Sequence, residues 1–563
     1  MIKTSLCSSL VSVMPTKPLP KNSLKNVTIC KNEPFSFQLA YKIAGGDAKS
    51  TQFFIRVKGD LPITNYYINC VPVLHTDVDK LQNAGGVGLY PDILMPKKVN
   101  PQIKVQNTCG GLWYTEKDED IQLFAFNDSS QAVWYSINEN GSEIPAGNYK
   151  LTFEIYGLDN KLITKNSLNV EVLDALLPKQ SFIYTNWFHC DCLAKNYGIK
   201  IFSDKFFTIM ASFLKTASQN GMNMVLLPAF TPALDTPIGG ERATAQLVGV
   251  TKNGDKYEFD FSLMERYIRV AQANGIVYFE HCHMFTQWGS AFAPKIMAKV
   301  NGKSKQIFGW KTPAASKEYT NFLRCYLKAF NKFIKSIGLE KKILFHVSDE
   351  PCDENYKNYE TAYNLISDLI SDYMAGDALS DPKFYESGLV KVPIASTRRV
   401  AEFVGKGDNI WCYYTGLEID KGMSNRLIQL PRQRNRMLGI QMYYYNIKGF
   451  LHWGYNYYFC ELSHGRFNPA INSCGFGNAG TSYSVYPAPD GTAYQSVRQK
   501  NFGEGIVDYR LLQLLESIAG RKVVDEVIVK HFGVPDFTVT PTDAAAIDNF
   551  RNEVEALIKA NIK

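Results

Sequence analysis

The strongest constraint on the fold is a change in hydrophobic period near residue 180. Before this point, apolar and polar residues alternate in short stretches, as in Phe35–Ile43 and Asn148–Gly157. After it, short apolar stretches alternate with longer segments in which an apolar residue recurs every three or four positions. A period of two indicates half-buried strands, and a period of 3.6 indicates amphipathic helices. The chain therefore predicts a β part followed by a part in which strands and helices alternate.

Residues 1–175 are predicted to form an antiparallel β-sandwich domain. Turn residues, as in the segment IPAGNY, separate its alternating stretches. Short strands at this spacing are typical of such a sandwich. The alternating stretches are Phe35–Ile43, Thr51–Gly59, Val133–Glu139 and Asn148–Gly157, and Leu173–Gln180 is predicted to be the linker that follows.

Residues 181–490 are predicted to form a catalytic (β/α)8 TIM-like barrel, because strand–helix alternation requires a parallel sheet with crossover helices. Ser203 and Gly221 are the expected start and stop of one of these helices. Residues 491–563 contain two amphipathic segments, which we expect to form a C-terminal helical segment packed on the barrel. Only seven of the eight strands are identifiable, in Ser181–His189, Met222–Phe230, Ile276–Phe285, Lys341–Pro351, Val392–Arg398, Asn409–Gly416 and Gly449–Asn456.

Composition limits the possible partners and compartments. The net charge is +7 without a dense Lys/Arg block, so nucleic acid is not an expected partner. The sequence has no run of 18 apolar residues, and we expect no membrane span. The 12 scattered Cys and a start without a convincing signal-peptide core favour a bacterial cytoplasm, whereas a signal removed beforehand would indicate secretion.

Two adjacent acids, Asp349 and Glu350, end the predicted strand in KKILFHVSDEP. Catalytic groups of a barrel lie at the carboxyl ends of its strands. Two like charges this close repel each other, so one pKa is expected to rise while the other stays low, which supplies an acid and an anion in one pocket. An equally weighted alternative is ordinary helix capping, with one acid at the N-cap and the other in the first turn.

Other strand ends carry further polar and aromatic side chains. In an extended strand, His189 and Asp191 would share one face, as would His281 and His283. Tyr413, Tyr414, Trp453, Tyr455 and Asn456 follow two later strands. Such groups suit carbohydrate recognition, because rings stack on sugar faces and polar groups bind hydroxyls. From these positions His189, Asp191, His283, Tyr414, Trp453 and Asn456 are predicted to bind the terminal sugar, with Trp453 as its apolar floor.

A zinc site is the competing hypothesis for the histidines. His189, Asp191, His281 and His283 could supply nitrogen and oxygen ligands. The sequence has neither an HExxH motif nor paired CxxC motifs, so no metal and no other cofactor is expected.

The motifs HVSDEP, KGFLHWGYNYY and FGEGIVDYRLLQLLE together resemble glycoside hydrolase family 123, whose known members are β-N-acetylgalactosaminidases. The segments KNEPFSFQLAYK and NWFHCDCLA also resemble this family, so the resemblance covers nearly the whole chain. It implies a retaining, substrate-assisted mechanism in which the 2-acetamido oxygen attacks C1 and forms an oxazolinium. Glu350 would be the general acid and then the base, and Asp349 would orient and stabilise the acetamido group.

The resemblance implies a carbohydrate partner: a glycan, glycolipid or oligosaccharide that ends in N-acetylgalactosamine. The choice between galacto and gluco sugars, the aglycone and the oligomeric state stay open. One alternative is a retaining glycosidase of another sugar specificity, with Glu280 or Glu418 as an enzymic nucleophile. Another is a non-catalytic carbohydrate-binding protein.

Overall fold

The computed structural model describes residues 1–21, 23–45, 50–75, 84–96, 121–287, 289–420 and 422–562. They form two compact units: residues 1–180 with 419–444 and 468–563, and residues 181–418 with 445–467. The predicted division treated residues 491–563 as a separate segment on the barrel. In the structure they belong to the same unit as the first 180 residues.

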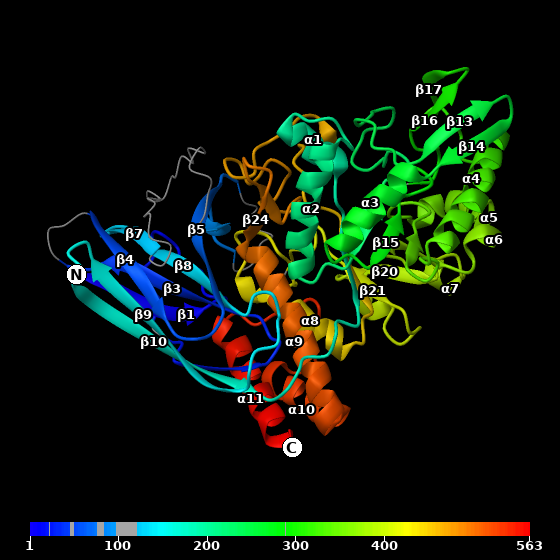
Figure 1. The fold of residues 1–563 in the computed structure, drawn as a ribbon. Coiled ribbons are helices and arrows are strands. Elements are labelled where there is room, and N and C mark those ends of the chain that lie inside the picture. The colour runs from blue at the N-terminus through cyan, green and yellow to red at the C-terminus, as the bar shows by residue number, and fades with distance from the viewer. Residues whose placement is uncertain are drawn as a thin grey trace. The chain divides into compact units, whose positions relative to one another are not determined.

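Two sheets form the β part of the first unit (Figure 1). One has the strand order β1-β3-β8-β5-β6-β24-β23 and the other β2-β10-β9-β4-β7; all neighbours pair antiparallel except β2 and β10. The sheets contact each other through rings such as Phe37 and Phe153, whose centroids lie 5.7 Å apart. The four alternating stretches of the sequence are confirmed as strands β3, β4, β8 and β9.

The strands of this unit are β1 (Ile2–Ser8), β2 (Asn26–Cys30), β3 (Phe35–Ile43), β4 (Ser50–Lys58), β5 (Ile63–Val73), β6 (Gly88–Pro96), β7 (Ile121–Phe126), β8 (Gln131–Ile137), β9 (Gly147–Gly157), β10 (Leu162–Leu173), β23 (Val485–Pro487) and β24 (Ala493–Ser496).

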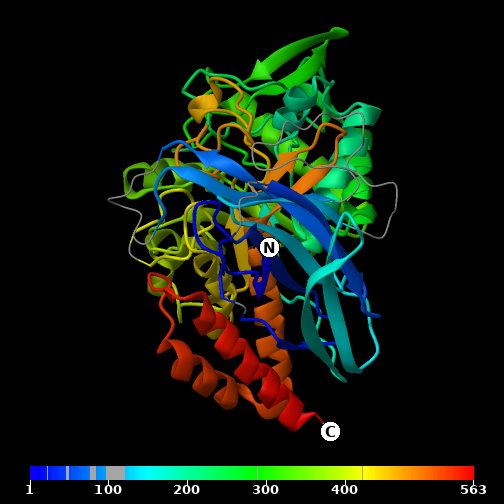
Figure 2. The ribbon, with the colours of Figure 1, turned by 90° about the vertical axis from the view of Figure 1, so that its left-hand side faces the viewer.

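Four helices complete the first unit: α8 (Arg432–Tyr444), α9 (Val497–Ala519), α10 (Arg521–Phe532) and α11 (Ala544–Asn561). Figure 2 shows α10 and α11 beside α9. Helices α8 and α9 approach closely at two glycines, because a Cβ added to Gly439 would lie 1.9 Å from the carbonyl oxygen of Gly505. No larger residue fits at this crossing without a shift of the backbone.

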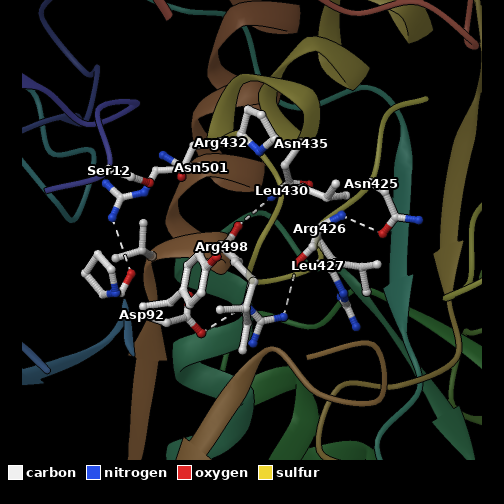
Figure 3. Close-up of a pocket in the computed structure, with 15 residues that line it drawn as sticks. Ser12, Asp92, Asn425, Arg426, Leu427, Leu430, Arg432, Asn435, Arg498 and Asn501 are labelled. Carbon is white, nitrogen blue, oxygen red and sulfur yellow. Dashed lines mark hydrogen bonds and ion pairs between the residues drawn. The ribbon is translucent and has the colours of Figure 1, made fainter. Parts of the chain in front are cut away.

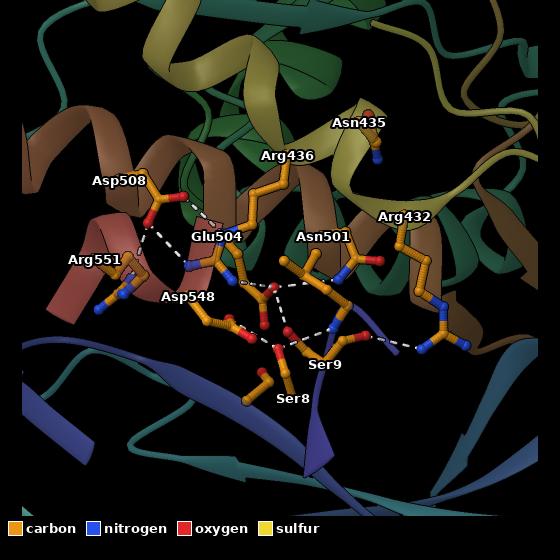
Figure 4. Close-up of polar contacts among 12 residues, drawn as sticks. Ser8, Ser9, Arg432, Asn435, Arg436, Asn501, Glu504, Asp508, Asp548 and Arg551 are labelled. Atoms are coloured by element: carbon orange, nitrogen blue, oxygen red, sulfur yellow. Dashed lines mark hydrogen bonds and ion pairs between the residues drawn. The ribbon is translucent and has the colours of Figure 1, made fainter. Parts of the chain in front are cut away.

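A buried network of charged residues joins α8, α9 and α11 (Figure 4). Arg436 binds Asp508 at 2.7 Å and Glu504 at 3.2 Å, and Arg551 binds Asp508 at 2.9 Å and Glu555 at 2.7 Å. Burial raises the pKa of Glu555 to about 7 against the opposing charge of Arg551. Glu555 therefore ionises at a higher pH than an exposed Glu does.

The first unit also encloses a small cavity (Figure 3), lined by Asp92, Arg426, Arg432, Arg498 and Asn501 among others. Its volume is about 20 Å³, which is room for about one water molecule. Arg498 is tied to Asp92 at 3.0 Å and to backbone carbonyls. The cavity is too small for a sugar and is part of the internal packing.

The second unit is built on a closed barrel of eight parallel strands in the order β11-β12-β15-β18-β19-β20-β21-β22. Each of the seven stretches identified in the sequence contains one of these strands. The eighth strand, β19, was missed because its sequence MAGDAL has no β-branched or aromatic residue. The strands are β11 (Ile183–Asn186), β12 (Met224–Leu227), β15 (Tyr278–His281), β18 (Ile343–Phe345), β19 (Met374–Leu379), β20 (Val392–Ser396), β21 (Trp411–Tyr413) and β22 (Gly449–His452).

Helices lie between successive barrel strands along the chain: α1 (Cys190–Tyr197), α2 (Asp204–Gln219), α3 (Ser262–Ala273), α4 (Lys317–Ser336), α5 (Tyr356–Asn364), α6 (Ser367–Ile370) and α7 (Lys383–Glu386). Two hairpins inserted before α3 and α4 pair into a four-stranded sheet, β14-β13-β16-β17 (Figure 1). Its strands are β13 (Gly249–Asn253), β14 (Lys256–Asp260), β16 (Ile296–Val300) and β17 (Lys303–Phe308).

Two local predictions for the barrel were wrong. Cys190–Tyr197 is helix α1 with His189 at its N-cap, so NWFHCDC does not place His189 and Asp191 on one face of a strand. His281 and His283 also separate, because β15 ends at His281 and His281 packs against Tyr326 of α4. Among the residues described, we find no helix that combines the length and hydrophobicity of a membrane span.

Candidate active site

Asp349 and Glu350 lie just beyond the carboxyl end of β18, as the sequence predicted. The side chain of Asp349 is 16% exposed, whereas Glu350 is at the surface. Glu350 has a φ of 45°, a left-handed conformation that a non-glycine residue rarely adopts. The hydroxyl of Tyr413, at the end of β21, donates a hydrogen bond to Glu350 Oε1 at 3.0 Å. Such backbone strain clusters at functional sites, which favours the catalytic interpretation of the pair.

Neither acid caps a helix. The segment after Pro351 is a short 3-10 helix, η1 (Asp353–Asn355), and its N-cap is Cys352. The capping alternative therefore does not explain why the two acids stand there.

A buried histidine lies among the strand ends beneath the pair. His346 presents Nδ1 to Asp377 Oδ1 at 3.1 Å and Nε2 to Glu280 Oε2 at 2.9 Å, and all three side chains are fully buried. Because a carboxylate oxygen only accepts, both ring nitrogens carry a proton and His346 is an imidazolium. Burial alone would lower the pKa of His346, but its bonds to the two carboxylates raise it to about 10.

Asp377, on the missed strand β19, is the residue on which this arrangement depends. Besides His346, it accepts hydrogen bonds from the backbone N–H groups of Val347 and Ser348 and from the hydroxyl of Tyr359 at 2.6 Å. Asp377 thus fixes the backbone that leads directly into Asp349. Sequence reasoning missed it, because a lone Asp in an unrecognised strand gives no signal.

His283 lies between this buried layer and Asp349. Its ring stacks on His346 with centroids 4.6 Å apart, and meets the ring of Trp187 edge-on at 5.3 Å. Its Nε2 is 3.9 Å from Asp349 Oδ1. Burial, and then the charge of His346, lower the pKa of His283 well below its usual range, so His283 is neutral. His283, one of the six predicted sugar-binding residues, therefore lies next to Asp349.

The two acids are electrostatically coupled. Burial, and then the charge of Glu350, raise the pKa of Asp349 well above its usual 3.8, while the charge of His346 opposes this rise. The pair therefore holds one proton over the pH range in which isolated carboxyls would both be ionised. One acid and one anion side by side can protonate a leaving group and stabilise a developing positive charge.

His189, Asp191 and Asn456 have hydrogen-bond partners within the protein. Arg242 binds both oxygens of Asp191, at 2.6 and 2.8 Å, and its Nη2 lies 3.2 Å from His189 Nδ1. Asn456, fully buried, bonds the backbone N–H and carbonyl of His189. The hydrogen bonds of these three residues join neighbouring loops of the barrel. Arg242 lies in a long loop after β12 and was not predicted from the sequence as a functional residue.

The predicted aromatic contacts also divide. Tyr414 is fully buried and packs on Phe450 and His452, so it belongs to the barrel core. Trp453 is partly exposed at the end of β22, with its ring 5.2 Å from that of Tyr457. Its backbone carbonyl is 2.8 Å from His189 Nε2. Trp453 keeps the exposure that a sugar platform requires, whereas Tyr414 does not.

Both alternative nucleophiles, Glu280 and Glu418, accept hydrogen bonds from donors within the protein. Glu280 is fully buried and accepts from Trp187 Nε1 at 2.9 Å, from Thr185 Oγ1 and from His346. Glu418 accepts from Ser396 Oγ and from the backbone N–H and hydroxyl of Thr415 at 2.7–2.8 Å. Both carboxylates are therefore held by donors within the protein.

The histidines of the zinc hypothesis do not converge. The described residues do bring His283, His346 and Asp377 together, with ligand-type atoms within 4.8 Å of one another. Both nitrogens of His346, however, already donate to carboxylates, and Asp377 accepts four donors. Because both nitrogens of His346 are used in these bonds, His346 and Asp377 form a hydrogen-bonded network.

Comparison with known proteins points to one family. The model described as "Glycoside hydrolase 123, catalytic domain" matches residues 187–515. A solved family 123 glycoside hydrolase from Clostridium perfringens, described in terms of glycolipid glycan hydrolysis, is 14% identical with a TM-score of 0.70, over 100% of this chain and 98% of that one. This likeness shows a shared fold along the whole chain.

Two further structures align much less well. A putative beta-galactosidase from Bacteroides fragilis is 9% identical with a TM-score of 0.31, over 85% of this chain and 58% of that one. A beta-glucuronidase from Parabacteroides merdae is 9% identical with a TM-score of 0.32, over 84% and 51%. Neither score carries an argument. No curated protein sequence matches the chain.

Proposed function

Because the chain belongs to glycoside hydrolase family 123, we propose that it releases terminal β-linked N-acetylgalactosamine by a retaining, substrate-assisted mechanism. Membership of the family makes the protein a glycoside hydrolase that acts on carbohydrate. The sugar, the anomeric outcome and the roles of the residues are the proposal. We also assign the barrel to the (β/α)8 type and the two sheets before it to a β-sandwich.

In the proposed mechanism, Glu350 protonates the glycosidic oxygen while the acetamido oxygen of the substrate attacks C1. The bond to the leaving group breaks as the bond to the acetamido oxygen forms, which gives an oxazolinium. Asp349 accepts a hydrogen bond from the acetamido N–H and stabilises the positive charge that develops on the sugar. Glu350 then takes a proton from water, which opens the oxazolinium with overall retention.

The observation that carries the proposal is the state of the carboxylates around the barrel end. Asp349 and Glu350 are adjacent, coupled and partly exposed, while Glu280 and Glu418 are enclosed by their own donors. An ordinary retaining enzyme needs a second carboxyl about 5–5.5 Å from the acid to attack C1. Because the alternative nucleophiles are engaged, attack by the acetamido group of the substrate is the favoured route.

Glycolipid glycans are the proposed natural substrates. The Clostridium perfringens structure is described in terms of glycolipid glycan hydrolysis, and it shares the fold of the whole chain. Free oligosaccharides with the same terminal sugar are the alternative, and comparing the two as substrates separates them.

The decisive experiment measures p-nitrophenol release from three β-glycosides: the N-acetylgalactosaminide, the N-acetylglucosaminide and the plain galactoside. Cleavage of the two acetamido sugars alone supports assistance by the substrate. The ratio of the rates for the N-acetylgalactosaminide and the N-acetylglucosaminide gives the preference for the galacto sugar. Cleavage of the plain galactoside at a comparable rate would refute obligate assistance and require an enzymic nucleophile. Sugar binding without any turnover would support the non-catalytic alternative.

Substitutions separate the roles of the two acids. Asp349→Asn is expected to lower kcat by about 100- to 1000-fold, as found when a group that stabilises transition-state charge is removed. Glu350→Gln should impair substrates with sugar leaving groups far more than p-nitrophenyl substrates, which need little protonation. An equal loss for both leaving groups would remove Glu350 from the acid role.

A further inference from the structure

His283 is a buried histidine without a hydrogen-bond partner among the residues that the structure describes. Its side chain is 4% exposed, and neither Nδ1 nor Nε2 is bonded. Buried polar groups of native proteins are nearly always paired, so each exception requires an explanation. A group left unpaired next to a candidate catalytic pair points to a bond that forms only when substrate is present.

The ring of His283 is held in place although its nitrogens are not bonded. It lies between His346, stacked at 4.6 Å with an interplanar angle of 25°, and Trp187, edge-on at 5.3 Å. Its Nε2 is 3.9 Å from Asp349 Oδ1, about 1 Å beyond hydrogen-bond length. Catalytic hydrogen bonds of unliganded enzymes are often this long and tighten in the substrate complex.

His283 has the protonation state that such a bond needs. His346 beneath it is a fixed imidazolium, because both of its nitrogens donate to carboxylates. A second positive charge stacked on this ring is opposed by charge repulsion. Neutral His283 therefore offers one N–H donor.

We propose that His283 is a positioning residue for Asp349, whose Oδ1 it binds through Nε2–H when the substrate enters. The inference rests on the proposed function and deepens it. With Oδ1 held by His283, the other oxygen of Asp349 is turned to the acetamido N–H of the substrate. Asp349 then receives two donors, both of which stabilise its ionised form.

The hydrogen bond from His283 to Asp349 also determines which of the two acids carries the proton that they share. In the free enzyme burial raises the pKa of Asp349, which favours the proton on Asp349. Two donors on the Asp349 carboxylate reverse that preference, so the proton passes to Glu350 and the charge of the pair is unchanged. Among the described residues, the charges of Glu350, His346 and Asp377 act on Asp349, and His283 lies 3.9 Å from its Oδ1. His346 and Asp377 are bonded to each other, so His283 is the one with donor capacity in reserve.

The test compares His283→Phe, which keeps an aromatic ring and removes both nitrogens, with His283→Gln, which restores an N–H donor. His281→Asn is the matched control, because His281 is equally buried but bonds Tyr326 and the carbonyl of Cys282. The pH dependence of kcat and KM is measured with p-nitrophenyl β-N-acetylgalactosaminide. For His283→Phe we expect kcat to fall by about 10- to 100-fold, as expected when a hydrogen bond to a charged group is lost. The acid limb of kcat should move to higher pH, and His283→Gln should recover part of both effects.

His281→Asn should lower stability and leave the acid limb in place, as any structural role would. An active wild-type enzyme whose His283→Phe variant keeps the wild-type acid limb and kcat would overturn the inference alone. A wild-type enzyme without turnover would instead refute the proposed function, and the inference with it.

A second measurement covers the case in which His283→Phe fails to fold. Nitrogen-15 NMR of histidine-labelled wild-type enzyme is recorded with and without the thiazoline analogue of the oxazolinium. A change at the Nε2–H of His283 on binding, absent in Asp349→Asn, is the expected result. A His283 signal that does not respond to the analogue would overturn the proposal.

Discussion

Replacing Asp377 by Ala tests the buried network on which the candidate site is built. The change removes the acceptor of four donors: His346 Nδ1, the N–H groups of Val347 and Ser348, and the hydroxyl of Tyr359. Breaking a buried ion pair from one side costs about 3–5 kcal/mol when the remaining charge is left unpaired, and the pairing of His346 with Glu280 places the cost here towards the lower end of that range. Each neutral donor left without an acceptor adds about 1–3 kcal/mol. Water that enters the new space and bonds these donors reduces this cost.

We therefore expect Asp377→Ala to lower the free energy of unfolding by at least about 4 kcal/mol, a large part of the about 5–15 kcal/mol of a typical protein. For a unit of this size the melting temperature should fall by on the order of 10 °C. Tryptophan fluorescence during urea unfolding measures the loss, and amide hydrogen exchange should be faster at Val347 and Ser348. Activity should fall as well, because these two residues lead into Asp349.

The matched control is Asp368→Ala. Asp368 binds Arg324 at 2.7 Å, but its side chain is 57% exposed, and such surface pairs contribute only about 0–1 kcal/mol. If Asp377→Ala costs no more than Asp368→Ala, the network does not support the site and the argument is refuted.

Three further predictions concern single side chains. Tyr413→Phe removes the 3.0 Å bond to Glu350 and should lower kcat about 10-fold without changing the melting temperature; unchanged kcat would show that the bond has no part in catalysis. Gly439→Ala should cost about 1–3 kcal/mol of unfolding free energy or more, because its Cβ meets the backbone of Gly505, whereas Gly465→Ala, which has open space, should be neutral. Glu555 is harder to ionise in the folded chain, so its contribution to stability is present below about pH 4.5 and is lost as pH rises towards about 7. Glu555→Gln should flatten that part of the curve of urea midpoint against pH, and an unaltered slope would contradict the assignment.

Local pattern predicted much of the fold. The alternation of Phe35–Ile43 is strand β3 with the same bounds, and Ser203 caps α2 by accepting from the N–H of Phe206. Period and capping depend on neighbours in sequence, so a sequence carries them directly. The missed strand β19 shows the limit: MAGDAL forms a strand because β18 and β20 pair with it on either side. Tertiary context overrides its weak intrinsic preference.

The candidate site divides in the same way. Asp349 and Glu350 could be predicted because strand ends of a barrel are marked by sequence. Asp191 and Asn456 are predicted to bind sugar, and only the structure shows that Arg242 binds Asp191 and that Asn456 binds the backbone of His189. Which partner a polar side chain binds depends on residues far away in the chain, so a local sequence pattern does not predict the partner.

The sequence by itself determined the family, the alternation of strands and helices, and the position of the carboxylate pair. Only the tertiary structure decided the electrostatics around that pair: a buried imidazolium between Glu280 and Asp377, and a neutral His283 stacked above it. The reason is physical. Strand and helix periods arise from covalent neighbours, whereas protonation states arise from charges that the barrel brings together from β15, β18 and β19 and from the exclusion of water around them.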